Sequence, residues 1–176
     1  MKLYVARHGQ TLWNLSGRVN GITDTVLTEN GIMQAEQLAE KMKEKNIDII
    51  VSSPLKRALD TAEIISKKCQ TEVITDSRLT EQNYGIFEGM SSKNPEFLEN
   101  KKCFAHKYPG GESMMQVAAR TYALIEEMKD AYKDKTVLFV CHGGVCRVIA
   151  TYFRDMTNEE FFLYKMENCG IEEYEA

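Results

Sequence analysis

Residues 2–6 read KLYVA and lead directly into Arg7-His8-Gly9, and residues 136–141 read TVLFVC and lead into His142-Gly143-Gly144. Each is a short, apolar, β-branched run that ends at a histidine-glycine turn, which is typical of a buried strand. Residues 48–52 (DIIVS) form a third run of this kind. Their nearly continuous apolar character predicts strands that are buried on both faces of a parallel sheet. Weaker strand patterns occupy two further segments, residues 72–75 and 171–174.

Helical patterns separate these strands. Thr28 is expected to cap a helix, because apolar residues recur at helical spacing after it. Ser53-Pro54 predicts a second helix start, since serine caps helices and proline fits the first helical position. Two more helices are expected after glycine pairs, at Gly110-Gly111 and Gly143-Gly144. The alternation of strands and helices predicts an α/β fold, a three-layer helix/sheet/helix sandwich with a mainly parallel central sheet.

The composition is that of an ordinary globular protein. The chain has 176 residues, is 43% hydrophobic, and carries 22 Lys plus Arg against 26 Asp plus Glu. This length, with no linker or repeat, predicts a single domain over residues 1–176. The mildly acidic charge argues against nucleic acid as a partner, and no apolar run reaches the roughly 18 residues that span a bilayer. No signal peptide is recognisable, so a cytoplasmic location is expected.

The carboxyl ends of the predicted parallel strands collect arginine and histidine side chains. Arg7 and His8 follow the first strand, Arg57 lies soon after the second, and His142 follows another. In such folds ligands bind beyond the carboxyl ends of the strands, so these residues are expected on one rim. Guanidinium groups bind phosphate through paired donors, and a helix N-terminus at Gly143 would add backbone N–H groups. Singly, each residue also fits a surface ion pair or a core position; together they predict a phosphoryl site.

These residues lie within motifs that resemble those of the histidine phosphatase superfamily, in its phosphoglycerate-mutase-like branch. Residues 7–11 (RHGQT) with Trp13-Asn14 resemble the opening motif, and residues 52–62 resemble the second arginine motif. Three later blocks are similar to the acid loop, the next signature and the second histidine motif: residues 79–89, 109–113 and 142–144. The blocks follow the family order. Three positions depart from the common pattern: Asn20, Val26 and Cys141.

The resemblance implies covalent catalysis through a phosphohistidine on His8. Its implied phosphate-binding residues are Arg7, His8, Asn14, Arg57, His142 and Gly143, of which Arg7, Arg57 and His142 also count as catalytic. Glu81 is the candidate general acid, and it would deprotonate the attacking water in the second half-reaction. Glu88 and Glu112 are rivals by composition, but the motif places neither at the acid position. Two residues are candidate substrate contacts, Asn20 and Ile22.

No metal and no other cofactor are expected. Only three histidines are available, and the flanking arginines would repel a cation. The five cysteines form no C-x-x-C pair, so reduced thiols are expected, with Cys141 and Cys146 as small buried hydrophobes. The expected partner is a small-molecule phosphomonoester, and the oligomeric state stays open.

Two interpretations stay open beside a phosphatase. One is a cofactor-dependent phosphoglycerate mutase, and the other is a catalytically silent phospho-ligand or protein-binding module on the same fold. A mutase must shield its bisphosphorylated intermediate from water, which requires a segment that covers the site. Only about 20 residues, Met90–Pro109, are available for such a cover. This short segment favours the phosphatase. The lysines of this segment are expected on a solvated face: Lys93, Lys101, Lys102 and Lys107. The substrate stays open among sugar phosphates, phosphoglycerates, nucleotides, phosphoserine and α-ribazole phosphate.

Overall fold

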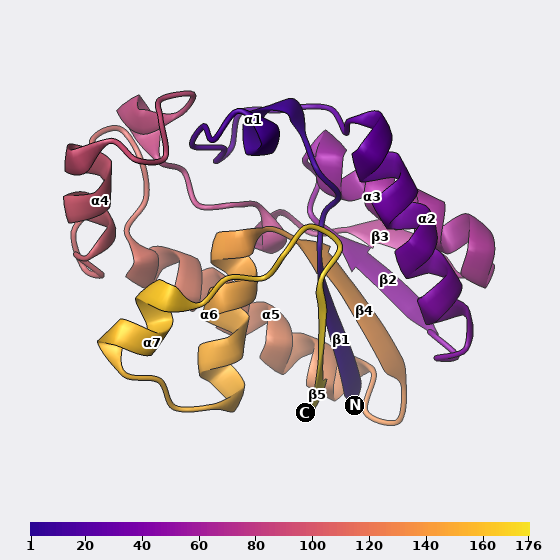
Figure 1. Cartoon of the computed structure of the whole chain (residues 1–176). Coiled ribbons are helices and arrows are strands. Elements are labelled where there is room, and N and C mark those ends of the chain that lie inside the picture. The colour runs from indigo at the N-terminus through magenta and orange to yellow at the C-terminus, as the bar shows by residue number, and fades with distance from the viewer.

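A five-stranded sheet lies at the centre of the computed structural model, which describes residues 1–176 (Figure 1). The strand order is β3-β2-β4-β1-β5. The strands are β1 Lys2–Arg7, β2 Ile49–Ser52, β3 Val73–Thr75, β4 Thr136–Cys141 and β5 Ile171–Glu175. The first four strands are parallel, and the edge strand β5 pairs with β1 in the antiparallel direction. This confirms the predicted α/β sandwich with a mainly parallel sheet.

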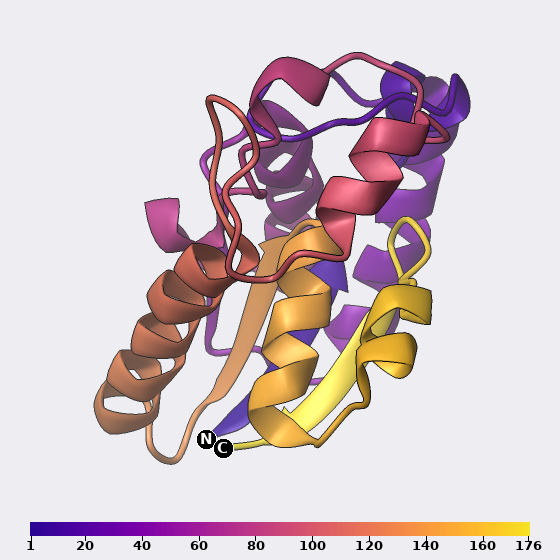
Figure 2. The ribbon, with the colours of Figure 1, turned by 90° about the vertical axis from the view of Figure 1, so that its left-hand side faces the viewer.

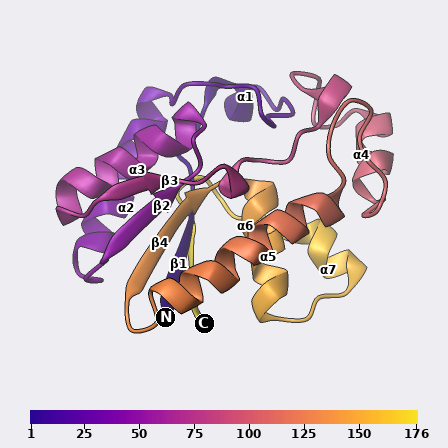
Figure 3. The same ribbon diagram turned by 180° about the vertical axis from the view of Figure 1, so that it is seen from behind.

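Four long helices cover the two faces of the sheet (Figure 3). They are α2 Glu29–Lys43 and α3 Lys56–Cys69 on one face, with α5 Met114–Ala131 and α6 Gly143–Phe153 on the other. A hydrophobic core lies on each face of the sheet, and the side chains of β1 point alternately into one and the other. Leu3 and Val5 pack toward α5 and α6, whereas Tyr4 and Ala6 pack toward α2 and α3. The double burial of the strands explains their continuous apolar sequence.

Three short helices were not anticipated from the sequence: α1 Leu12–Leu15, α4 Pro95–Lys101 and α7 Asn158–Leu163. Two single turns of 3₁₀ helix lie between β3 and α4, at Ser77–Leu79 and Gly85–Phe87. A small third core of four aromatic side chains and one valine anchors α4, and its members are Val19, Tyr84, Phe87, Phe97 and Tyr108. Figure 2 shows α4 above the N-terminal end of α6. No helix has the length and apolar character needed to cross a membrane.

The helix starts differ in part from the prediction. Thr28 caps α2 as predicted, with its hydroxyl accepting from the Gly31 amide at 3.0 Å. The Ser53-Pro54 start is wrong, because α3 begins at Lys56 and its N-cap residue makes no side-chain cap. Instead the Asp24 carboxylate, from a distant loop, accepts from the Lys56 amide at 2.8 Å. The helix expected after Gly143-Gly144 begins at Gly143 itself.

All five cysteines are free thiols. Cys141 and Cys146 are buried in the core between β4 and α6, with their sulfur atoms 3.5 Å apart. They occupy the place of small apolar side chains, as predicted.

Candidate active site

His8 directly follows the last residue of β1 and is only 3% exposed. Its Nδ1 atom lies 2.7 Å from the Gly9 carbonyl oxygen. A carbonyl only accepts, so Nδ1 carries the hydrogen and Nε2 carries a lone pair and no hydrogen. Burial, together with the charges of Arg57 and Arg7, holds the pKa of His8 well below its ordinary value. The imidazole is therefore neutral, with Nε2 available as a nucleophile.

Arg57 is fully buried in the first turn of α3, although its position off the apolar stripe suggested a solvated alternative. Its Nε donates to His8 Nε2 at 3.2 Å, and its two terminal nitrogens donate to the Thr23 and Gly21 carbonyls at 3.0 and 2.6 Å. Burial lowers the pKa of Arg57 to about 10, so the guanidinium stays protonated at neutral pH. These three bonds fix the plane of the guanidinium beside the nucleophile.

Glu88 holds the loop that fixes Arg57. Its carboxylate accepts from the Ile22 and Thr23 amides at 2.8 and 2.7 Å and from the Thr23 hydroxyl. The carbonyl of Thr23 is one of the two that receive Arg57. Glu88 is thus a loop anchor that is linked to His8 through three successive hydrogen bonds, by way of Thr23 and Arg57, and it does not line the cavity.

His142 is the N-cap residue of α6 and is completely buried. Its ring centre lies 5.1 Å from that of His8. Its Nε2 lies 2.8 Å from the Ser53 hydroxyl, which also accepts from the Leu55 amide. Its Nδ1 is a buried atom with no partner in the protein. Burial, then the charge of Arg57, hold the pKa of His142 well below its ordinary value. A buried ring nitrogen without a partner, beside His8, is suited to contact a ligand.

Arg7 and the N-terminus of α6 form the opposite side of the site. The Arg7 Nη1 donates to the Met166 carbonyl at 2.7 Å, while its Nε has no partner. A Cβ added at Gly143 would lie 3.5 Å from that Nε, so the guanidinium packs against the first residue of the helix. A guanidinium with a free donor beside helix N–H groups is a favourable place for an anion.

Asn14 is oriented to donate. Its Oδ1 accepts from the Thr11 amide at 3.1 Å and from Asn168 Nδ2 at 3.2 Å, which leaves its own amide hydrogens unused. Asn168 also donates to the His8 carbonyl at 3.0 Å. Asn168 was missed in the sequence because it lies in the segment before β5, outside the motifs.

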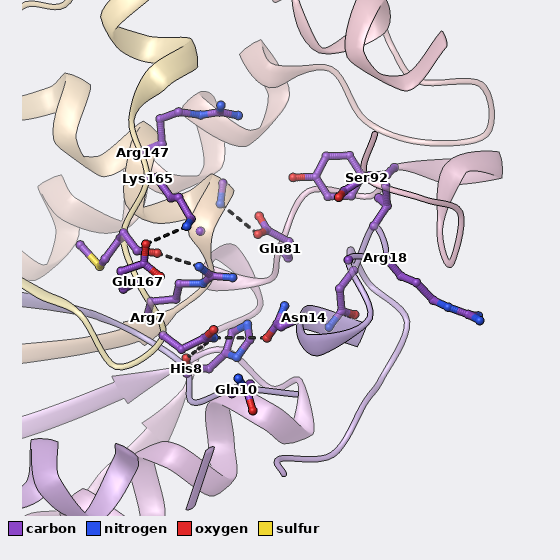
Figure 4. Close-up of a pocket in the computed structure, with 18 of the residues that line it drawn as sticks. Arg7, His8, Gln10, Asn14, Arg18, Glu81, Ser92, Arg147, Lys165 and Glu167 are labelled. Carbon is purple, nitrogen blue, oxygen red and sulfur yellow. Dashed lines mark hydrogen bonds and ion pairs between the residues drawn. The ribbon is translucent and has the colours of Figure 1, made fainter. Parts of the chain in front are cut away.

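Glu81 follows the 3₁₀ turn at Ser77–Leu79 and is 5% exposed. Its Oε1 accepts from the Gln82 amide and its Oε2 from the Gly144 amide, both at 2.9 Å. These two bonds direct the carboxyl group into the cavity that contains Arg7 and His8, as Figure 4 shows. The predicted acid and nucleophile therefore face one space.

That space is a cavity of about 590 Å³ beyond the carboxyl ends of the strands. The predicted residues in its wall are Arg7, His8, Asn14, Asn20, Glu81 and Gly143. Arg57 and His142 are not part of this wall, but both lie beside His8: Arg57 Nε donates to His8 Nε2, and the ring of His142 is 5.1 Å from that of His8. Ile22 lies outside the wall, 42% exposed on the loop that Glu88 holds. No group of three or more His, Cys, Asp or Glu side chains is placed to hold a metal ion.

Asn20 is held by hydroxyl groups inside the cavity wall. Its Nδ2 donates to Thr25 Oγ1 at 2.9 Å and to Thr11 Oγ1 at 3.3 Å, while its buried Oδ1 has no partner. The wall also contains residues from outside the motifs, among them Lys101, Arg147, Lys165, Glu167 and Asn168. Lys101 is half-buried there, which corrects the expectation of a solvated face for this lysine.

A neutral buried histidine lies beside arginine and amide donors at the carboxyl ends of a parallel sheet, an arrangement suited to binding a phosphoryl group. The sequence model of the histidine phosphatase superfamily (branch 1) matches residues 3–176, and the chain belongs to this family.

Relatives in the family have different names. The chain is 31% identical over 178 residues to the probable phosphoglycerate mutase GpmB of Yersinia pestis, covering 97% of this chain and 83% of that one. It is similar in structure to a mycobacterial glucosyl-3-phosphoglycerate phosphatase solved with VO3, with a TM-score of 0.88, 30% identity and coverage of 98% and 90%. It is also similar to a mutant phosphoserine phosphatase of Entamoeba histolytica in complex with phosphoserine, with a TM-score of 0.85, 31% identity and coverage of 98% and 89%.

Proposed function

We propose that the protein is a metal-independent phosphomonoesterase that hydrolyses a small phosphorylated metabolite through a phosphohistidine on His8. The observation that carries this proposal is the state of the imidazole: the Gly9 carbonyl holds the hydrogen on Nδ1, and Nε2 points a lone pair into a ring of donors. Phosphatases among the structural neighbours support the same activity.

In the first half-reaction, His8 Nε2 forms a bond to phosphorus and the ester oxygen leaves. Glu81 gives its proton to that oxygen, because an alkoxide is a poor leaving group without one. Arg7, Arg57 and His142 donate to the phosphoryl oxygens and stabilise the charge that they carry in the transition state.

In the second half-reaction, the Glu81 carboxylate takes a proton from water, and the hydroxide oxygen bonds to phosphorus as the Nε2–P bond breaks. Inorganic phosphate leaves, and His8 returns to its neutral form with Nδ1 still bonded to Gly9. Neither half-reaction needs an oxidant, a metal or a cofactor.

Hydrolysis is favoured over mutase activity by the size of the cavity. A volume of about 590 Å³ leaves space for on the order of ten water molecules beside a small substrate. Phe97 and Lys101 of α4 form part of one wall, so the segment 90–109 borders the site. This space lets water reach the phosphohistidine.

The trapping of a phosphoenzyme tests the nucleophile. Rapid quenching at alkaline pH after mixing with a ³²P-labelled substrate should leave one acid-labile phosphate on His8. His8→Ala should retain neither the label nor turnover, whereas His106→Ala, which removes an exposed histidine, should retain both. Full activity in His8→Ala would contradict the proposal.

The alternative, mutase activity, is supported by the Yersinia relative, which is named a probable phosphoglycerate mutase. Incubation with 3-phosphoglycerate and catalytic 2,3-bisphosphoglycerate separates the two activities. Release of inorganic phosphate faster than formation of 2-phosphoglycerate is expected, and the reverse order would favour the mutase.

A further inference from the structure

The segment that joins α7 to β5 contacts the carboxyl end of β1, where the nucleophile lies. The Gly170 carbonyl accepts from the Arg7 amide, and the Cys169 amide donates to the Arg7 carbonyl, both at 3.1 Å. The Met166 carbonyl accepts from Arg7 Nη1 at 2.7 Å. Met166 and Asn168 also line the cavity. This segment is therefore part of the site, although it lies outside the motifs that indicated the site in the sequence.

Asn168 uses both hydrogens of its side-chain amide within the protein. Its Nδ2 donates to the His8 carbonyl at 3.0 Å and to Asn14 Oδ1 at 3.2 Å. Because the His8 carbonyl can only accept, the atom of Asn168 that faces it is the nitrogen and not the oxygen. The second hydrogen of that nitrogen is then directed to Asn14. Asn168 thus connects the backbone of the nucleophile to the side chain of Asn14.

Two donors determine which way the Asn14 amide faces. The backbone N–H of Thr11 donates to Asn14 Oδ1 at 3.1 Å, and Asn168 Nδ2 is the second donor to the same atom. If the amide were turned by half a rotation, its own Nδ2 would face both donors. The observed orientation leaves Asn14 Nδ2 without a partner in the protein and free to donate to a ligand.

The bond from Asn168 is the long-range one of the two. The bond from Thr11 is local, because it belongs to the capping box of α1, a helix of four residues with no buried side chain. So short a helix is not stable by itself, and a bond within it restrains Asn14 only weakly relative to the sheet. The bond from Asn168 spans 154 residues and connects Asn14 to the end of β1 through the His8 carbonyl.

The C-terminal segment thus contacts two of the proposed phosphate-binding side chains. The Met166 carbonyl orients Arg7, and Asn168 orients Asn14. In the view of Figure 4, Arg7 and Asn14 lie on different sides of the His8 ring, and all three residues line the same cavity. A phosphoryl group at His8 would therefore lie between donors that this one segment holds in place.

We propose that Asn168 is a positioning residue of the phosphoryl site, which holds the Asn14 amide so that its Nδ2 donates to a phosphoryl oxygen. The proposal rests on the phosphomonoesterase function. Asn168 acts through Asn14, so it does not need to contact the substrate. A neutral amide suits this role, since a carboxylate at position 168 would place an acceptor against two acceptors, the His8 carbonyl and Asn14 Oδ1.

A double-mutant cycle with p-nitrophenyl phosphate tests the role. Asn14→Ala removes a hydrogen bond to a charged oxygen and should lower kcat/KM by roughly 10- to 100-fold. Asn168→Ala leaves Asn14 free to turn and should lower kcat/KM by roughly 5- to 10-fold in the wild-type background. In the Asn14→Ala background the same change should cost less than about twofold, because the residue through which Asn168 acts is absent.

Equal losses from Asn168→Ala in the two backgrounds would overturn the proposal, and so would an unchanged kcat/KM in the wild-type background. Asn158→Ala is the matched control. Asn158 is the first residue of α7, is exposed, and forms no side-chain hydrogen bond. Its removal should leave kcat/KM unchanged in both backgrounds.

Urea unfolding separates positioning from a merely structural role. Asn168→Ala also removes the bond to the His8 carbonyl, so its unfolding midpoint should fall in both backgrounds. The loss of activity, in contrast, should occur only where Asn14 is present. If activity instead falls together with stability in both backgrounds, Asn168 has a structural role and the proposal is wrong.

If no phosphomonoester, including p-nitrophenyl phosphate, releases phosphate, it is the proposed function that fails. The role of Asn168 is then decided by calorimetric titration of the same four proteins with inorganic phosphate. Asn168→Ala should weaken binding by roughly 5- to 10-fold in the wild-type background and by less than about twofold in the Asn14→Ala background. Equal affinities of the four proteins, or no binding by the wild type, would refute the positioning role.

Discussion

His8 and Arg57 are hydrogen-bonded to each other before any ligand arrives. The bond from Arg57 Nε to His8 Nε2, at 3.2 Å, uses the same lone pair that would attack phosphorus. The guanidinium therefore occupies the lone pair of His8 Nε2, and in the proposed reaction this hydrogen bond has to break before Nε2 bonds to phosphorus. Burial of both groups keeps water from taking this place.

Glu81→Gln tests the general acid. The amide keeps the size of the side chain but has no acidic proton, so turnover of alkyl phosphates should fall by roughly 100- to 10,000-fold. The loss with p-nitrophenyl phosphate should be much smaller, because p-nitrophenolate leaves without protonation. Steady-state rates on the two substrate types measure the difference. Equal losses on both would show that Glu81 does not act as the acid.

Some site residues could be predicted from the sequence because they directly follow a strand or begin a helix in a motif. Arg7, His8 and His142 are of this kind, and the structure places them together. Arg147 could not be found in this way, since it lies in an apolar helical run where a residue that faces a cavity and one that faces the core have the same spacing. Asn168 could not be found in this way either, because it lies 160 residues after His8 in the sequence and contacts the His8 carbonyl only in the folded chain.

The first turn of α6 holds the Glu81 carboxylate in place. Gly144 donates its amide to Glu81, and a Cβ at this position would lie 2.5 Å from Glu81 Oε1 and 3.1 Å from the Tyr84 hydroxyl. Gly144→Ala should therefore displace the carboxylate and lower turnover of alkyl phosphates on the order of 100-fold. Gly143→Ala, whose Cβ meets only Arg7 at an ordinary 3.5 Å, should cost less. Kinetic assays should give this order, and the opposite order would contradict the geometry.

The start of α3 depends on a side chain from outside the helix. Asp24 accepts from the Lys56 amide, so Asp24→Ala should lower the free energy of unfolding by about 1 kcal/mol. It should also reduce turnover, because Arg57 lies in this first turn. Asp60→Ala removes only the ion pair with Lys56 and should cost about 0.5 kcal/mol or less. Urea unfolding measures both, and equal losses would argue against the cap.

This cap explains why one helix start was predicted wrongly. Ser53 has the residue type of a cap, but its hydroxyl is used to orient His142. Local sequence indicates which residues can cap a helix, and it does not show that a catalytic side chain will compete for the same hydroxyl. The three inner strands β1, β2 and β4, by contrast, were predicted within a residue or two, because burial on both faces leaves a continuous apolar run.

At the scale of the whole molecule, the two buried histidines make stability depend on pH. Their pKa values lie well below 6.5 in the folded protein, whereas the unfolded chain titrates near 6.5. Below that pH the unfolded state binds protons that the folded state does not, so stability falls as the pH falls. The slope should approach about 1.4 kcal/mol per pH unit for each histidine between pH 6.5 and the folded values.

Urea unfolding in phosphate-free buffers at pH 7.5, 6.0 and 5.2 measures this slope. His142→Gln should reduce it by about half, and His106→Gln, which removes an exposed side chain, should leave it unchanged. A stability that stays constant from pH 7.5 to 5.2 in the wild type would show that the buried imidazoles are protonated in the folded protein.

The strand order also has a consequence for synthesis on the ribosome. β1 leaves the ribosome early, yet its two neighbours in the sheet are β4 and β5, which emerge near the end of translation. Until then both edges of β1 are unpaired, and a nascent chain in this state is exposed to aggregation and to chaperones. Arg7 and His8 are thus synthesised long before β4 and β5, the strands that pair with β1. A chain whose synthesis ends before β4 cannot form the site and is expected to have no turnover.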